Sequence, residues 1–470
     1  SGYDGGSTVS GGYGNTSSGG YSTIGGGSEN ISSANESTVG GGFGNEASGD
    51  RSTIGGGSRN TSSGGRSTVS GGYCNTSSGY GSTVGGGGVN ITSGSYSTIS
   101  GGANSTLSGC NSTISGGCFN IVSGNLSTIG GGCRNIVSGS SSTVSGGTSN
   151  IASGSSATVG GGTSNIASGD CSTVSGGTDN TSSGCYSTIG GGYSSTASGD
   201  YSTIGGGCDN TASGYNTTIG GGEGNIASES YSIIGGGHDN TTSGCYSTVS
   251  GGTDNTSSGA CSTVGGGCNN TATNQFATIS GGNCNIAEGY AATVAGGQNN
   301  KACGDNFSTV GGGDGNTASG YYGSTVGGGM GNTSSGYYST VSGGCGNTAS
   351  GGCSTIGGGA DNTASGYCST ISGGTGNTAS GYCSTISGGG SNTASNANSH
   401  ILGSNITSDK DNTTFVQNLH ITGSTTANSI LQLSRRETTP TGVEGMIIAS
   451  GSVGASKPYY FNGTTWNPLF

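Results

Sequence analysis

The chain has 470 residues, of which only 27% are hydrophobic, and its formal net charge is −12. A compact globular protein of this length would hold about 45–50% apolar residues, so this composition excludes a thick hydrophobic core. The surplus of acid argues against binding to phosphate backbones, and no run of about 18 apolar residues predicts a transmembrane helix. We therefore expect neither nucleic-acid binding nor membrane insertion.

A 15-residue unit fills the chain from about residue 7 to residue 395. The stretch from Ser202 to Asn216, STIGGGCDNTASGYN, shows its form. The 26 units align on one Asn, which only Ser105 and Ser195 replace, and two units near residues 300–332 have 16 residues. A fixed period without helical spacing is typical of a repeat architecture, so we expect one supersecondary element copied along the chain.

Each unit predicts two short strands joined by turns. The β-branched Thr, Ile and Val favour strands, whereas 112 glycines disfavour helix. We expect glycine at the tight corners, where φ is positive. One unit buries too little apolar surface to fold alone, but stacked copies can pair each strand with the copies above and below. At roughly 4.8 Å per coil, the stack would form a rod on the order of 125 Å long.

Alternation within each strand predicts which side chains point inward. In the first strand Ile204 faces the interior and Thr203 faces outward; in the second, Ala212 shares the inner face with the repeated Asn. The predicted core column includes Ile24, Ile54, Ile99, Ile129, Ile204, Ile219, Ile356 and Ile386. The Asn residues are expected to hydrogen-bond from coil to coil as a ladder that includes Asn15, Asn30, Asn45, Asn210, Asn225 and Asn240.

Two outward columns are candidate contact surfaces. The Thr203 column is Thr in every unit from Thr8 to Thr385 except at Ile233. The Thr211 column changes to isoleucine in several units, which predicts a contact with a neighbouring chain. These isoleucines are Ile31, Ile91, Ile121, Ile136, Ile151, Ile166, Ile226 and Ile286.

The 16 cysteines fall at equivalent places in the repeats. Equivalent residues of adjacent coils would lie about 5 Å apart, which is within disulfide range. The candidate disulfide positions are Cys118, Cys133, Cys353, Cys368 and Cys383. Unpaired cysteines that only pack are the alternative. Disulfides would imply an extracellular compartment, and the absence of CxxC spacing argues against zinc.

Copied head to tail, the motif SxxSTIxGGxxNxASG resembles the YadA-like head repeat of trimeric autotransporter adhesins. Similar arrays occur in phage and viral fibre proteins. The resemblance covers roughly residues 1–400 and implies an all-β fold, a left-handed parallel β-roll or β-solenoid. It also implies a trimer, intertwined or packed side by side. The family repeat is slightly shorter than the 15 residues found here, so the turns must differ.

The sequence divides into three parts. We expect a solenoid array over residues 1–398, a cap or neck over 399–428, and a small β module over 429–470, which holds all three prolines and the only Trp. The ending KPYYFNGTTWNPLF resembles the small β ending of phage and viral tail fibres, with Asn462-Gly463 as a hairpin turn. No membrane anchor like that of the autotransporter adhesins is recognised, which favours a fibre attached by other means.

No catalytic motif stands out. His238, His400 and His420 lie far apart, without partners at catalytic or metal-ligand spacing. We therefore predict no enzyme, no cofactor and no metal. The sequence predicts an extracellular structural fibre or adhesin on a virion or cell surface, a homotrimer that could join end to end. Many weak contacts would attach it to a glycan or protein receptor. The alternative is an ice-binding solenoid that uses the Thr203 column.

Overall fold

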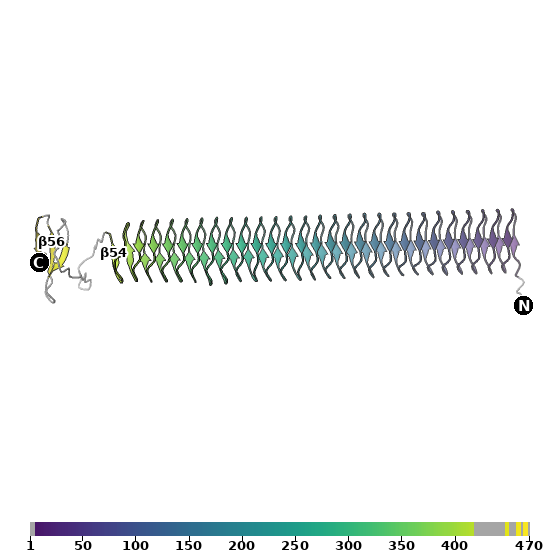
Figure 1. The fold of residues 1–470 in the computed structure, drawn as a ribbon. Coiled ribbons are helices and arrows are strands. Elements are labelled where there is room, and N and C mark those ends of the chain that lie inside the picture. Colours follow the sequence, from purple (N-terminus) through teal and green to yellow (C-terminus); the bar gives the residue numbers. More distant parts are fainter. Residues whose placement is uncertain (1–4, 418–446, 451–456, 462–463, 469–470) are drawn as a thin grey trace, which may run out of the picture. The chain divides into compact units, whose positions relative to one another are not determined.

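The structure, a computed structural model, describes residues 5–417, 447–450, 457–461, 464–465 and 466–468. The chain divides into two compact units, Ser1–Gln417 and Asn418–Phe470. Within the described residues every regular element is a β-strand. The first unit is a straight stack of coils that ascends from β1 to β54 (Figure 1). The prediction of an all-β parallel solenoid is confirmed.

The odd-numbered strands form one parallel ladder along the stack. They run from β1 (Thr8–Val9) and β3 (Thr23–Ile24) through β27 (Thr203–Ile204) and β29 (Thr218–Ile219) to β51 (Thr385–Ile386). The ladder ends with β53 (His400–Leu402) and β54 (Thr414–Val416), which complete a 28-stranded sheet. Thr203 pairs with Thr218 and Ile204 with Ile219, so the register repeats every 15 residues and identical side chains lie over one another.

The even-numbered strands form a second parallel ladder. Each has two residues and begins at the residue after the repeated Asn or Ser, from β2 (Thr16–Ser17) through β28 (Thr211–Ala212) to β52 (Thr393–Ala394). A third ladder, which the sequence did not predict, consists of single bridges between residues two places before the Asn, such as Cys208 with Glu223. Each coil is therefore fixed to its neighbours at three places around its circumference.

The two 16-residue units keep the register of the strands. Thr293 pairs with Thr309, and Thr309 pairs with Thr325. The extra residue is accommodated at a corner, where Asn306 bridges to both Tyr290 and Tyr322. Insertions in a turn leave the ladders intact because the strand pairing lies elsewhere in the coil.

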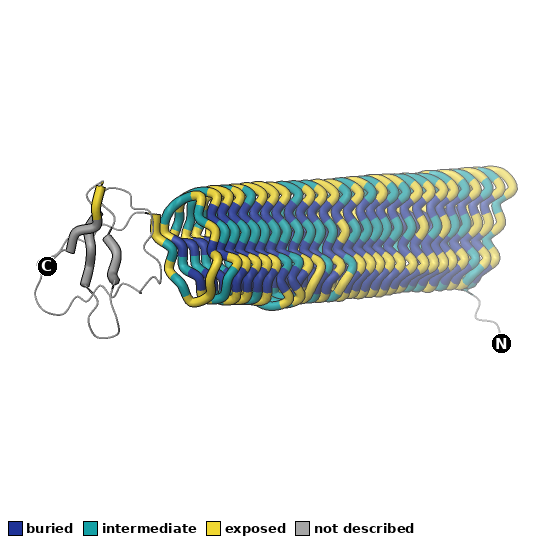
Figure 2. The backbone as a smooth tube through the Cα atoms, turned by 60° about the vertical axis from the view of Figure 1, so that its left-hand side comes forward, coloured by how far each residue is buried: buried dark blue, intermediate teal, exposed yellow. Residues whose placement is uncertain are grey.

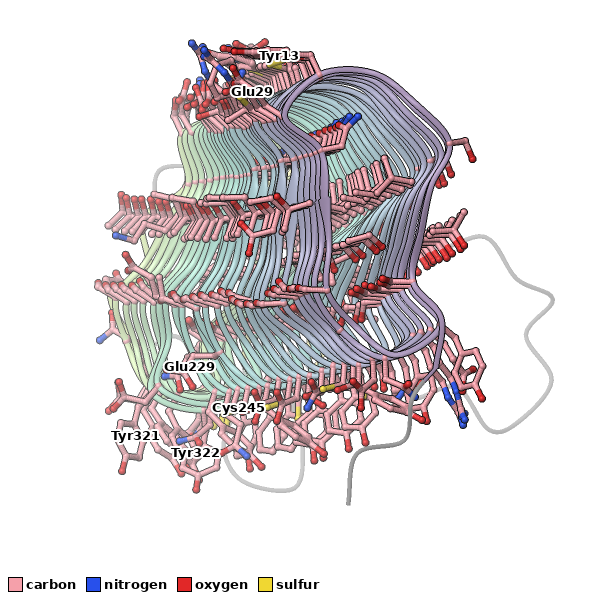
Figure 3. The ribbon with its side chains drawn as sticks, turned by 90° about the vertical axis from the view of Figure 1, so that its right-hand side faces the viewer. Tyr13, Glu29, Glu229, Cys245, Tyr321 and Tyr322 are labelled. Carbon is pink, nitrogen blue, oxygen red and sulfur yellow. A yellow bond between two sulfur atoms is a disulfide. The ribbon has the colours of Figure 1, made fainter. Side chains whose placement is uncertain are left out.

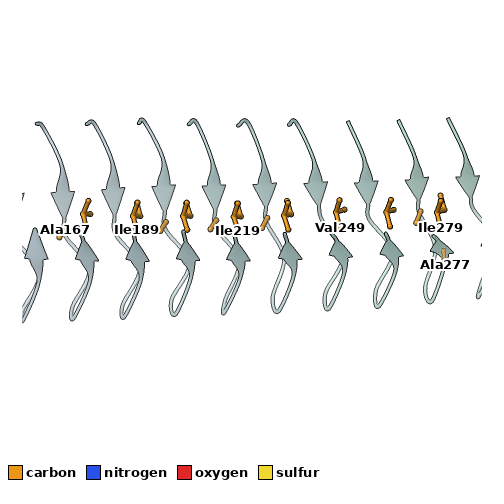
Figure 4. Packing of buried hydrophobic residues seen from close by; sticks show 14 of the residues in the cluster. Ala167, Ile189, Ile219, Val249, Ala277 and Ile279 are labelled. Atoms are coloured by element: carbon orange, nitrogen blue, oxygen red, sulfur yellow. The ribbon is translucent and has the colours of Figure 1, made fainter. Parts of the chain in front are cut away.

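The core is thin and continuous. One Ile or Val per coil and one small residue opposite it are fully buried, and the buried stripes run the length of the unit (Figures 2 and 4). The eight predicted core residues are all 0% exposed: Ile24, Ile54, Ile99, Ile129, Ile204, Ile219, Ile356 and Ile386. Because each Ile packs mainly on the Ile or Val of the next coil, no single coil holds a core of its own.

Two corners of each coil adopt the left-handed conformation, but glycine rarely occupies them. Tyr201 has φ 59° and Asp209 has φ 52°, and equivalent residues repeat this along the stack. The Tyr201 N–H donates to Cys185 O at 2.8 Å, in the preceding coil, whereas the Thr203 N–H donates to Thr217 O, in the following coil. The left-handed residue reverses the direction of its N–H, and the hydrogen bond this allows offsets the strain.

The C-terminal end of the stack is covered by larger side chains. In β54, Phe415 lies opposite Ile401 of β53, and Phe415 and Ile406 pack half-buried against the core. The second unit contains an antiparallel three-stranded sheet of β55 (Ile447–Ser450), β56 (Lys457–Phe461) and β57 (Trp466–Pro468). Phe461 pairs with Trp466, and the predicted turn residues Asn462 and Gly463 lie outside the described residues.

Candidate functional site

The repeated Asn side chains form a hydrogen-bonded ladder inside the rod. Oδ1 of Asn210 accepts the backbone N–H of Asn225 at 3.0 Å. Nδ2 of Asn225 donates to Asn210 Oδ1 at 3.1 Å, to Gly221 O at 3.1 Å and to Gly237 O at 2.9 Å. One amide therefore connects three coils. The predicted members Asn30, Asn45, Asn210, Asn225 and Asn240 are 0% exposed, and Asn15 is the half-exposed first rung.

Burial of this ladder decides the meaning of the many Asn-x-Ser/Thr tripeptides. Asn60, Asn75, Asn180 and Asn255 begin such tripeptides and are 0% exposed. Each uses its Nδ2 to donate to two glycine carbonyls. A glycan cannot be attached to a nitrogen enclosed in the folded stack, so these positions are structural.

A second polar column inside the rod is made of serines. Where two serines face each other, they pair, as Ser334 Oγ with Ser339 Oγ at 2.7 Å. Where the facing residue is larger, the serine donates to the next coil instead, as Ser112 Oγ to Gly124 O at 2.9 Å. Where the facing residue is alanine, several serine hydroxyls are buried without a partner, among them Ser354, Ser369 and Ser384. The interior is thus narrow and polar rather than a ligand cavity.

The outward face of the odd-numbered ladder is the threonine face, defined by Thr8 to Thr385 at 15- or 16-residue intervals with Ile233 as the exception. Thr203 and most of its equivalents are half-buried, flanked by fully buried serine and isoleucine neighbours in the chain. Because parallel pairing sets Thr on Thr in every coil, their hydroxyls and methyls form one regular row. His400 closes this row, with Nε2 2.7 Å from Ser387 Oγ.

The outward face of the even-numbered ladder carries an apolar row. Ile121, Ile136, Ile151 and Ile166 pair in successive coils, and we call these four residues the isoleucine stripe. Ile121 is 42% exposed and the other three are half-buried. In the same column only Glu46 and Lys301 carry charge. This face therefore offers an apolar surface that is almost free of charge.

Aromatic side chains line one edge of the rod. Figure 3 shows Tyr321 and Tyr322 there, with Glu229 and Cys245, and Tyr13 and Glu29 on the opposite edge. The longest aromatic run joins five coils: Tyr186 stacks on Tyr201 at 5.0 Å and Tyr231 on Tyr246 at 4.8 Å. Tyr215 joins the two pairs by edge-on contacts. We call this side the aromatic edge, and most of its tyrosines are 39–62% exposed.

A hollow of about 440 Å³ opens on the aromatic edge near its N-terminal end. Gly65 contributes no side chain, which leaves space between Asp50 and Tyr80. Arg66 lies over the Tyr80 ring, with Cζ 5.6 Å from the centroid. Arg51 lines the same hollow, and its ion pair with Glu36, at 3.0 Å, raises its pKa. Sequence reasoning missed this hollow because it depends on side chains from four successive coils.

The structure brings only some of the predicted cysteines together. Cys118 and Cys133 form a disulfide across adjacent coils, with Cα atoms 4.7 Å apart. Cys353, Cys368 and Cys383 are free thiols, half-buried in one column of the aromatic edge. Both arrangements follow from the repeat period, which the sequence shows directly.

The histidines are not brought together. His238 contacts Asp239, with Nδ1 3.2 Å from Oδ2, His400 lies at the end of the stack, and His420 is outside the described residues. Among the described side chains, no three from His, Cys, Asp and Glu gather as a metal would require. In the same parts of the chain, no helix has the length and apolar character needed to cross a bilayer. Comparison of the chain with protein-family models and with curated proteins finds no match.

Proposed function

We propose that this chain is a non-enzymatic structural fibre that acts as an extracellular adhesin on a virion or a cell surface. The observation that carries the proposal is the unbroken register of the odd-numbered ladder, from Thr8 to Val416. One continuous stack of coils at roughly 4.8 Å each spans about 125 Å. Such a rod places a surface far from its attachment point without a hinge between its coils.

Stiffness is supported by how each coil is held. Three parallel ladders, the asparagine ladder and the Ile or Val column all link a coil to both neighbours. Bending the rod would have to break several of these contacts at one level together. Repeat proteins of this kind transmit force along their axis because every contact is between nearest neighbours.

We propose further that three copies associate through the isoleucine stripe. An apolar row without charge is a surface that water exposes at a cost, and a second copy offers the same row in the same spacing. A trimer would present three aromatic edges at once. Weak contacts of each edge with a glycan or protein receptor would then add through avidity.

A second function has its own observation. The threonine face repeats hydroxyl and methyl groups at one spacing over the stack, and such a flat, regular row could bind an ice surface. This alternative needs the threonine face to be open to water. It makes no use of the isoleucine stripe or the aromatic edge.

Two measurements on the purified chain separate these functions. Electron microscopy and light scattering test the fibre: we expect rods of about 125 Å with the mass of three chains. A flexible coil or a compact particle would refute the fibre. Thermal hysteresis tests the alternative, since an ice-binding face produces it and a fibre does not. Rods without hysteresis would leave the fibre as the function.

A further inference from the structure

Three cysteines stand in one column at adjacent levels of the aromatic edge. Cys353, Cys368 and Cys383 are each separated by 15 residues, and each adopts the left-handed conformation, with φ of 55°, 53° and 49°. Their N–H groups all donate to the preceding coil, at 2.6–2.8 Å. Because the three backbones repeat one geometry, the three thiols leave the rod in the same direction. We call them the thiol ladder.

The coil spacing decides which of these thiols can pair. Cys118 and Cys133 occupy another column, are also one coil apart and are bonded, with Cα atoms 4.7 Å apart. That spacing lies within the disulfide range of about 4.4–6.8 Å. Cys353 and Cys383 are two coils apart, which is twice 4.7 Å, or about 9.4 Å. This exceeds the limit of about 7 Å, so only Cys368 can reach a partner, and it has two.

The side-chain interactions agree with this geometry. The pKa of the Cys368 thiol is raised, first by burial and then by its interactions with the Cys353 and Cys383 thiols. The Tyr367 and Tyr382 rings stack beside the ladder, with centroids 5.7 Å apart. Tyr338 occupies the same column before the ladder and Asn398 after it, so no fourth thiol continues the row. All three thiols are half-exposed and open to a small molecule.

We propose that Cys353, Cys368 and Cys383 form a thiol–disulfide exchange site for small-molecule disulfides, in which Cys368 pairs with one neighbour and leaves the other to carry a mixed disulfide. The site does not depend on the fibre function.

The chemistry balances as follows for a disulfide RSSR. The thiolate of an end cysteine attacks one sulfur of RSSR, forms a mixed disulfide and releases RSH. The Cys368 thiolate then attacks the cysteine sulfur of that mixed disulfide and expels a second RSH. Two thiols are oxidised and one RSSR is reduced. The remaining end thiolate can attack Cys368 Sγ and move the bond to the other pair, or can react with a second RSSR and retain one R–S group.

The experiment oxidises the full chain with glutathione disulfide at about pH 8.5, where thiolates are present. After an acid quench and alkylation, chymotrypsin separates the ladder, because Tyr367 and Tyr382 directly precede Cys368 and Cys383. Mass spectrometry should find both Cys353–Cys368 and Cys368–Cys383 links, one per molecule, with one glutathione on the remaining end. A Cys353–Cys383 link, or three glutathiones on the ladder, would overturn the proposal.

Matched variants make the test independent of a folding defect. Ser141 and Ser156 occupy the equivalent corner in other coils, so serine is tolerated there. C368S should change the ladder from one disulfide and one adduct to no disulfide and two adducts. C353S and C383S should each keep one disulfide and no adduct. Cys208, whose column neighbours are Tyr193 and Glu223, should take glutathione but no intrachain partner in every variant. If C368S keeps a ladder disulfide, the proposal is wrong.

Discussion

Oδ1 of Asn210 accepts the backbone N–H of Asn225 at 3.0 Å, although the two residues are 15 positions apart and neither lies in a strand. The same contact recurs from coil to coil, so a side chain supplies at the corner the hydrogen bond that a strand supplies elsewhere. A buried backbone N–H without a partner is costly, and the Asn removes that cost at every level of the stack.

Replacing Asn225 by aspartate should destabilise the rod strongly. The carboxylate would lose the two donors to Gly221 O and Gly237 O and would lie buried against carbonyl oxygens. We expect a loss of about 3–5 kcal/mol for an uncompensated buried charge. Urea unfolding of the full chain followed by circular dichroism measures it. The control is N225S, because serine stands naturally at Ser195 and keeps a longer contact of 3.3 Å to Asn210 N. We expect about 1–2 kcal/mol for N225S, and equal effects of both changes would contradict the ladder.

Two adjacent glycines should respond differently to alanine. Gly207 has φ 93°, and a Cβ there would collide with Gly222 O of the next coil and come within 2.8 Å of Asn210 Nδ2. A Cβ on Gly206 would meet nothing within 4 Å. G207A should cost about 2–4 kcal/mol, whereas G206A should stay within about 1 kcal/mol of the parent. Thermal melts of the two variants decide the matter, and a neutral G207A would mean that the corner can relax.

The serine column predicts a pair of opposite outcomes. Ser339 Oγ contacts Ser334 Oγ at 2.7 Å and donates to Gly336 O at 2.8 Å, so S339A should cost about 1 kcal/mol. Ser369, two coils later, has a buried hydroxyl without a partner. S369A should therefore be neutral or stabilising, because it removes a desolvated group. Chemical denaturation of both variants gives the comparison. A loss at Ser369 as large as at Ser339 would point to an internal water that satisfies the hydroxyl.

The stacked tyrosines should make the rod sensitive to alkali. The pKa of Tyr215 is raised, first by the charge of Tyr231 and then by partial burial. A group whose pKa is higher in the folded chain than in the unfolded one stabilises the fold below its unfolded pKa. That contribution is lost as the pH rises from about 10 through the folded pKa. Melts across this range should show decreasing stability, and ultraviolet titration of Y231F should show tyrosine ionisation at lower pH. An unchanged titration in Y231F would contradict the coupling.

The trimer can be tested without disturbing the coil. I151K places a charge in the middle of the isoleucine stripe, and Lys301 shows that lysine fits this column, with Nζ 3.1 Å from Glu288. We expect the mass in solution to fall from three chains to one while the circular dichroism spectrum is unchanged. T203K, on the threonine face, is the control and should keep the trimer. A trimer that survives I151K would place the contact elsewhere.

Several features could be predicted from the sequence because the period itself encodes them. The alternation of Thr203 and Ile204 assigned an outer and an inner face, and the structure confirms the parallel stack with a 15-residue register. The glycine expectation was only partly right. Gly207 does have positive φ, but Tyr201 and Asp209 adopt the left-handed conformation without being glycine. Their variable side chains gave no signal, because the reason lies in a hydrogen bond to the preceding coil.

What the sequence determined alone is the composition of each column: one Ile or Val, one Asn and one outward Thr per unit, with too little apolar surface for any unit to fold by itself. What the tertiary structure decided is which groups meet between coils. The partners of Asn225, the stacking of Tyr201 on Tyr186, the hollow beside Arg66 and the reach of Cys368 all join residues of different units. The physical reason is that a solenoid places its contacts along the rod axis, at right angles to the direction of the chain.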